Sequence, residues 1–209
     1  MKLIYQTHSP YARKVLVAAH EIGLAERLEV IHHETSPTWR NDEVFALNPL
    51  GKVPVLILDD GLALFDSSVI CEYLDGLHGG ARLIPVEPRA RLLSLRLQAL
   101  AHGLCDAGIA VRHETVRRPE PYRYPAMRDG QIEKLTTAYD FLEADEIIAG
   151  AARPDICIGQ VALATALSWL DFRGLPAFEP CRPRLAAWYR AVLQRPSMLA
   201  TPLCGDTVD

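Results

Sequence analysis

Apolar and polar residues follow two different periods in the first third of the chain. Short apolar runs at residues 2–6, 28–33 and 62–65, and at the end of the stretch 48–58, predict strands. Between the first two runs, apolar residues recur at helical spacing from Tyr11 to Ile22, and Gly23 ends that helix. Asp66 opens another helix. The order βαβ then ββα predicts a small mixed sheet with helices on its faces.

From residue 89 onward the pattern is helical, with few strand signals. We expect helices at residues 89–117, 127–143, 158–172 and 184–194. The third of these is nearly all apolar and should be the central, buried helix. The glycines and prolines of residues 77–88 indicate a linker. The expected organisation is an α/β domain over 1–76, a linker over 77–88 and an all-α domain over 89–209.

Composition narrows the class of protein. The net charge is −4 and no stretch is dense in lysine or arginine, which excludes nucleic acids and acidic membranes as expected partners. The apolar runs are shorter than a membrane span and the start lacks a signal core, so we expect a cytoplasmic protein. The five cysteines are widely spaced without a CxxC pair, so we expect reduced thiols and no metal site.

The tetrapeptide Ser9-Pro10-Tyr11-Ala12 stands between the first strand and the first helix. Enzymes of the thioredoxin and glutaredoxin kind carry Cys-Pro-x-Cys at this point of the fold. Ser9 and Ala12 take the places of both cysteines, so the chain should not exchange electrons through its own sulfurs. We interpret the neighbouring His8 as incidental, because adjacent side chains of an extended backbone face opposite ways.

Two further segments have two interpretations each. Pro54 precedes a strand; it is either an ordinary trans proline or a cis proline that leaves the N–H and C=O of Val53 free for an extended peptide. Asp66 and Ser67 either cap a helix only, or also present its free N–H groups to an anion.

Four stretches together resemble the glutathione transferase superfamily: residues 9–14, 48–56, 65–70 and 83–85. The resemblance covers essentially the whole chain, and the active-site turn is similar to that of bacterial members with serine there. It implies a thioredoxin-like α/β N-terminal domain followed by an all-α C-terminal domain. It also implies glutathione as co-substrate, a small hydrophobic electrophile as second substrate, no metal, and a homodimer that serves detoxification.

In this resemblance Ser9 donates a hydrogen bond to the thiolate of glutathione. Free thiols have a pKa of about 8.5, and lowering it by about two units needs ~2.7 kcal/mol. A hydroxyl donor contributes roughly 1.5–3 kcal/mol, and a helix N-terminus about 0.3–1 kcal/mol. Tyr5, at the end of the first strand, is the alternative donor, as in members with a catalytic tyrosine.

The resemblance also implies the residues that bind glutathione. Val53, beside Pro54, pairs with the cysteinyl unit, while Asp66 and Ser67 hold the γ-glutamyl end. Lys52 either pairs with the glycyl carboxylate or is solvated. Weaker candidates are Trp39 and Arg40, near the glycyl end, and Asp106, which either reaches across a dimer interface or is a solvated helix charge.

One segment departs from the family pattern. The central helix usually opens with serine or threonine followed three residues later by aspartate, whereas this chain has Cys157 and Gln160, with Asp155 as another candidate cap. A function of another class, a non-catalytic binding module on the same fold, stays open beside the enzyme.

Overall fold

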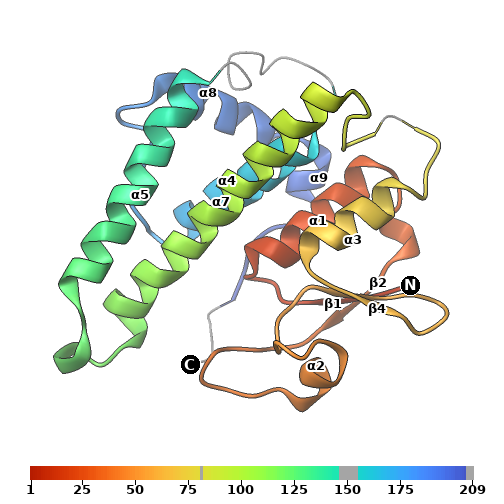
Figure 1. The fold of residues 1–209 in the computed structure, drawn as a ribbon, viewed down its shortest axis with the longest axis horizontal. Coiled ribbons are helices and arrows are strands. Elements are labelled where there is room, and N and C mark those ends of the chain that lie inside the picture. Colours follow the sequence, from red (N-terminus) through yellow and green to blue (C-terminus); the bar gives the residue numbers. More distant parts are fainter. Residues whose placement is uncertain (81, 146–154, 206–209) are drawn as a thin grey trace.

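The computed structural model describes residues 1–80, 82–145 and 155–205. Residue 81 of the predicted linker, and residues 146–154 and 206–209 of the predicted helical domain, lie outside the described residues. Figure 1 shows a sheet with its covering helices at one side of the molecule and a set of longer helices at the other.

The predicted mixed sheet is confirmed. Its four strands are β1 (Lys2–Tyr5), β2 (Glu29–His32), β3 (Val55–Ile57) and β4 (Ala63–Leu64). Their order is β2-β1-β3-β4, with β1 and β2 parallel and the other two pairs antiparallel. This is the thioredoxin-like arrangement that the βαβ–ββα order predicts.

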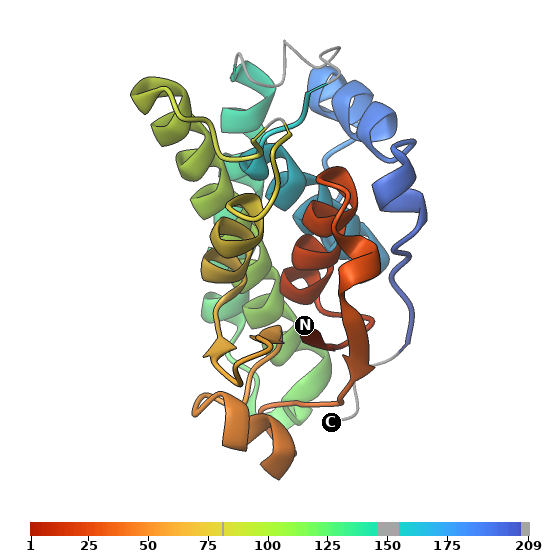
Figure 2. The same ribbon diagram turned by 90° about the vertical axis from the view of Figure 1, so that its right-hand side faces the viewer.

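The sheet has a helical layer on each face. Alternation along β1 sends Leu3 and Tyr5 into the core with α1 (Pro10–Glu21) and α3 (Ser67–Asp75), and Ile4 toward the short helix α2 (Asp42–Leu47). A 3-10 turn, η1 (Ala25–Arg27), joins α1 to β2. Figure 2 shows α1 and α3 side by side.

The described residues of the second half form helices joined by turns and contain no strand, as predicted. Its elements are α4 (Pro88–Arg112), the π turn η2 (His113–Arg117), the 3-10 turn η3 (Glu120–Tyr122), α5 (Pro125–Ala144), α7 (Ile158–Phe172), α8 (Pro183–Val192) and α9 (Pro196–Leu199). The sequence pattern did not predict α9, the π turn or the 3-10 turn η3. No helix in the described ranges is long and apolar enough to cross a bilayer.

Helices α4 and α7 pack in parallel at the centre of the helical half (Figure 1). Gly159 near the start of α7 touches Ser94 of α4, and Gly108 further along α4 touches Trp169 near the end of α7. The two helices therefore end on the same side of the molecule.

The N-terminus of α7 explains how the chain tolerates its unusual cap. The N–H of Cys157 donates to Oε1 of Gln160 at 3.0 Å, so glutamine serves as the second member of the capping box. The N–H of Gly159 donates to Ser94 Oγ at 3.2 Å, and that of Ile158 to the carbonyl of Leu83 at 2.9 Å. Groups distant in sequence thus satisfy the helix start, and Asp155 is not the cap.

Candidate functional site

The topology of the sheet brings three loop segments to one edge. Ser9 follows the end of β1, and Val53 precedes β3, which runs antiparallel to β1 with Ile4 opposite Val55. Asp66 follows the end of β4, which runs antiparallel to β3 with Leu64 opposite Leu56. The three predicted segments therefore meet at the same edge of the sheet.

Ser9 is the N-cap of α1. Its hydroxyl oxygen accepts a hydrogen bond from the N–H of Ala12 at 3.2 Å, and its own N–H donates to the carbonyl of Gln6. Only 8% of the residue is exposed. The hydroxyl hydrogen has no acceptor among the described residues, so it is available to a ligand at the start of the helix.

Tyr5 is enclosed in the core beneath this turn. It is 4% exposed, and its ring meets that of His32 edge to face at a centroid distance of 5.4 Å. Burial raises the pKa of Tyr5 to about 12, although the nearby charge of Arg13 opposes that rise. Phenolate formation is therefore less favourable at Tyr5 than in water.

The peptide bond between Val53 and Pro54 is cis, as is that between Phe65 and Asp66. Of the two interpretations of Pro54, the cis one is therefore observed. The N–H and C=O of Val53 make no hydrogen bond within the described part of the chain. They are the pair of backbone groups that an added extended strand would use.

Asp66 and Ser67 form the start of α3. The Asp66 carboxylate accepts from the N–H of Ser68 at 2.8 Å. Partial burial alone would raise the pKa of Asp66, but hydrogen bonds from backbone N–H groups and the charge of Lys14 outweigh it and lower that pKa. The Ser67 hydroxyl is buried and has no partner among the described residues, although the residue is only 1% exposed.

The loop after β2 packs beside the segment that leads to Pro54, because Thr35 Oγ1 donates to the carbonyl of Gly51 at 2.7 Å. Lys52 and Trp39 on these segments are exposed. Arg40 is paired with Asp42 at 2.6 Å and lies over the ring of Phe45. Arg40 is thus held by contacts within its own chain.

Between α1 and α4 the structure reveals a polar network that the sequence analysis missed. Tyr11 donates its hydroxyl hydrogen to Asp106, an exposed residue of α4. A contact of Asp106 across a dimer interface stays a prediction. Lys14 is 1% exposed and its Nζ lies 2.9 Å from Nε2 of His102. The helical spacing of Tyr11, Lys14 and Ala18 was the available signal, since it puts a lysine on the buried face of α1.

Comparison with known proteins identifies the family. Residues 8–77 match the family model of the glutathione S-transferase N-terminal domain. Over 204 residues the chain is 31% identical to the uncharacterized GST-like protein YibF of Escherichia coli (strain K12), covering 96% of this chain and 98% of that protein. The chain belongs to the glutathione transferase superfamily.

Solved structures of other glutathione transferase family members support the same assignment. A member from Pseudomonas fluorescens Pf-5, crystallised with bound glutathione, is 42% identical and superposes with a TM-score of 0.90 over 98% of this chain and 99% of that one. A second structure from that organism holds S-(propanoic acid)-glutathione, with 43% identity, a TM-score of 0.86 and 98% and 100% coverage. The resemblance in sequence therefore extends to the whole fold.

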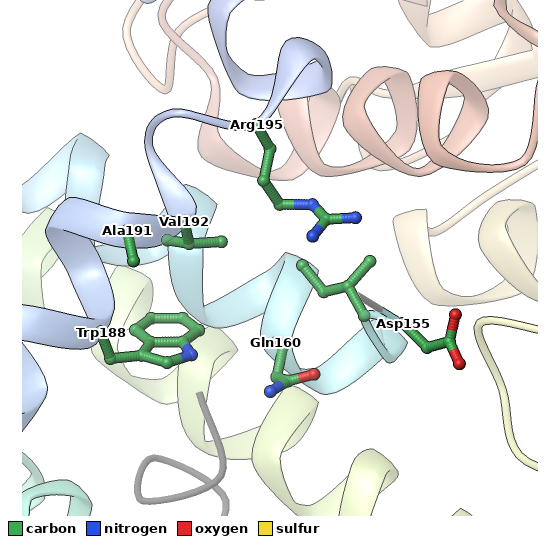
Figure 3. A pocket seen from close by; sticks show the side chains of 7 residues that line it. Asp155, Gln160, Trp188, Ala191, Val192 and Arg195 are labelled. Carbon is green, nitrogen blue, oxygen red and sulfur yellow. The ribbon is translucent and has the colours of Figure 1, made fainter. Parts of the chain in front are cut away.

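The cavity found between two helices of the second half lies away from Ser9, Val53 and Asp66. A cavity of about 60 Å³ between α7 and α8, lined by Gln160, Trp188 and Arg195 among others (Figure 3), is far smaller than ligand pockets of roughly 300–1,000 Å³. In the described ranges, no three or more His, Cys, Asp or Glu side chains are grouped as a metal site would require.

Proposed function

We propose that this protein is a glutathione transferase that binds glutathione and activates its thiol for attack on a small hydrophobic electrophile. The observation that carries the proposal is the geometry of Ser9. Its oxygen is fixed by the N–H of Ala12, and its hydrogen is left to point at a sulfur placed at the start of α1. The hydroxyl and the helix start together supply the ~2.7 kcal/mol that lowering a thiol pKa by about two units requires.

The other groups at the same edge suit the rest of glutathione. The backbone N–H and C=O of Val53, which have no partner in the described part of the chain, match the cysteinyl unit, which is an extended peptide. The buried hydroxyl of Ser67 and the N-terminus of α3 match the γ-glutamyl carboxylate, and the Asp66 carboxylate matches the ammonium of that unit. Lys52, with Trp39 and Arg40 nearby, would border the glycyl carboxylate.

The proposed reaction needs no redox partner. The thiol loses its proton to solvent, and the thiolate then attacks an electrophilic carbon, so that one C–S bond forms. Either a leaving group departs with its electron pair, or the displaced π electrons take up a proton. A thioether is the product in both cases. The Pseudomonas relative solved with S-(propanoic acid)-glutathione supports a site that accepts such a thioether.

Ser9 is preferred to Tyr5 as the donor for a physical reason. Tyr5 is enclosed between the sheet and the helices, and burial raises its pKa to about 12. A weaker acid is a weaker hydrogen-bond donor to an anion, and a donor that lies in the core cannot reach the ligand without moving. Tyr5 remains the alternative that the experiment below tests.

The first experiment is an ultraviolet titration of the thiolate of bound glutathione, carried out on the native protein, Ser9→Ala and Tyr5→Phe. We expect the bound thiol to titrate well below 8.5 in the native protein and in Tyr5→Phe, and to return toward that value in Ser9→Ala. Failure of millimolar glutathione to bind would instead favour the non-catalytic binding module. A homodimer and a role in detoxification remain predictions from the family resemblance, and a cytoplasmic location remains a prediction from the sequence pattern.

A further inference from the structure

Lys14 is a buried cation in the second turn of α1. The residue is 1% exposed, and its Nζ contacts two neutral acceptors of α4, Gln98 Oε1 at 3.3 Å and His102 Nε2 at 2.9 Å. Within the described ranges no carboxylate forms an ion pair with this nitrogen. Burying a charge costs free energy unless a counter-charge is near, so Lys14 needs an explanation beyond packing.

The first turns of α3 lie against Lys14. Burial lowers the pKa of Lys14, and Cys71 and then Asp66, both from this part of the chain, oppose that change. The charges of Lys14 and Asp66 thus act on each other across the contact between α1 and α3. Ser67 lies one helical turn before Cys71, on the same buried face of α3. Lys14 therefore stands behind the start of α3.

That helix start combines an unpartnered donor with negative charge. Ser67 is 1% exposed, and its hydroxyl has no partner among the described residues. The Asp66 carboxylate accepts from the N–H of Ser68 at 2.8 Å, and both Asp66 and Asp106 act electrostatically on His102. The free N–H groups of a helix start favour an anion, but an anion placed here would meet the charge of Asp66. Binding it requires a positive charge nearby.

The other titratable groups around Lys14 do not supply this charge. Burial, followed by the charge of Lys14, lowers the pKa of His102 to about 4, so its imidazole is neutral at pH 7. Burial raises the pKa of Cys71 to about 11 and also raises that of Cys105, so both thiols keep their protons. Among these neighbours the positive charge belongs to Lys14.

We propose that Lys14 is a positioning residue of the glutathione site, whose buried charge offsets the repulsion between Asp66 and the γ-glutamyl carboxylate. This inference rests on the proposed function and refines it. The γ-glutamyl end carries a carboxylate and an ammonium, so its site needs charges of both signs. Asp66 receives the ammonium, and the Ser67 hydroxyl with the start of α3 receives the carboxylate. Lys14 balances the two carboxylates from behind, without touching the ligand.

The test uses a ligand that lacks one charge. The tripeptide analogue 4-aminobutanoyl-cysteinyl-glycine keeps the ammonium, the thiol and the glycyl carboxylate of glutathione but has no γ-glutamyl carboxylate. By calorimetry at pH 7, we expect the native protein to bind glutathione about tenfold or more tightly than the analogue. Lys14→Met, which keeps the length of the side chain and removes its charge, should lower that ratio about five- to tenfold. Lys134→Met, which removes an exposed charge on α5, should leave the ratio unchanged.

A second measurement needs no variant. The chain has four lysines, Lys2, Lys14, Lys52 and Lys134, so NMR of lysine labelled with carbon-13 at Cε follows the titration of Lys14 by itself. An anion near an ammonium group raises its pKa. We therefore expect saturating glutathione to raise the pKa of Lys14, and the analogue to raise it less. The same pKa with both ligands would overturn the inference, even if Lys14→Met failed to fold.

These experiments separate the role of Lys14 from the proposed function. The ratio of the two affinities is taken within each protein, so a change in folded fraction cancels. If Lys14→Met bound glutathione with the native ratio, Lys14 would serve packing alone and the transferase proposal would stand. No binding of glutathione by the native protein would overturn both.

Discussion

The side-chain nitrogen of Lys14 lies 2.9 Å from Nε2 of His102, in a buried contact that joins α1 to α4. Gln98 of α4 adds an acceptor at 3.3 Å from the same nitrogen. An imidazole that accepts from an ammonium group must be neutral at that nitrogen. The contact therefore links the protonation state of one histidine to the packing of the helical half on the thioredoxin-like half.

This link predicts acid sensitivity. Burial, followed by the charge of Lys14, lowers the pKa of His102 from 6.5 to about 4. Between those values the unfolded chain binds more protons than the folded one, so stability is complete above pH 6.5 and falls as the pH drops toward 4. In His102→Gln, which keeps an acceptor but cannot titrate, this acid-side loss should shrink by about 1–3 kcal/mol.

Urea denaturation between pH 4 and pH 7 measures the effect on the native protein and His102→Gln. His20→Gln, which changes a histidine outside the network, serves as the matched control. A slope that is the same in His102→Gln and in the native protein would show that this histidine is protonated in the folded state.

Two glycines should respond in opposite ways to replacement by alanine. At Gly159 a methyl group would overlap the carbonyl oxygen of Ser94 and lie 2.8 Å from Cβ of Leu97, so α4 and α7 would have to separate. Gly159→Ala should cost about 3 kcal/mol or more. Gly103, within α4, has open space at that position, and Gly103→Ala should stabilise the protein by about 0.5–1 kcal/mol. Thermal denaturation of the two variants checks both signs.

Local signals predicted much of the fold and part of the site. The central helix was predicted with its observed bounds, because its run of apolar residues has one interpretation in a chain of this length. Asp66 was found because an N-cap is a short-range pattern, readable within four residues. Ser9 was found because the tetrapeptide that contains it stands between the first strand and the first helix. The contact between Lys14 and His102 could not be predicted, since it joins residues 88 apart and depends on how two helices meet. The π turn was not predicted because it is a single turn at the end of a helix, too short to give a periodic pattern of its own.

The hydrogen bond from Tyr11 to Asp106 should couple the same two helices. Tyr11→Phe removes the donor to an exposed carboxylate and should cost about 0.5–1.5 kcal/mol, and a double-mutant cycle with Asp106→Asn should give a coupling energy of similar size. Tyr73→Phe is the matched control, because that hydroxyl has no hydrogen-bond partner among the described residues. Additive effects of the two changes at Tyr11 and Asp106 would contradict the coupling.

Replacing Ser67 by alanine distinguishes a role of its hydroxyl in ligand binding from a role in folding. Its hydroxyl is buried without a partner in the described chain, so the free protein bears the desolvation cost of that group and gains nothing for it. Ser67→Ala should therefore leave the unliganded protein equally stable or more stable by up to about 1 kcal/mol, and should weaken glutathione binding by about tenfold.

The measurement is thermal denaturation with and without glutathione, since a ligand that binds only the folded state raises the midpoint in proportion to its affinity. Ser68→Ala serves as the control: it keeps the backbone N–H that Asp66 accepts and should retain the native response to glutathione. If Ser67→Ala destabilised the free protein and kept the full shift with glutathione, the hydroxyl would be part of the fold and not of the ligand site. The reverse result would place the γ-glutamyl carboxylate at the start of α3.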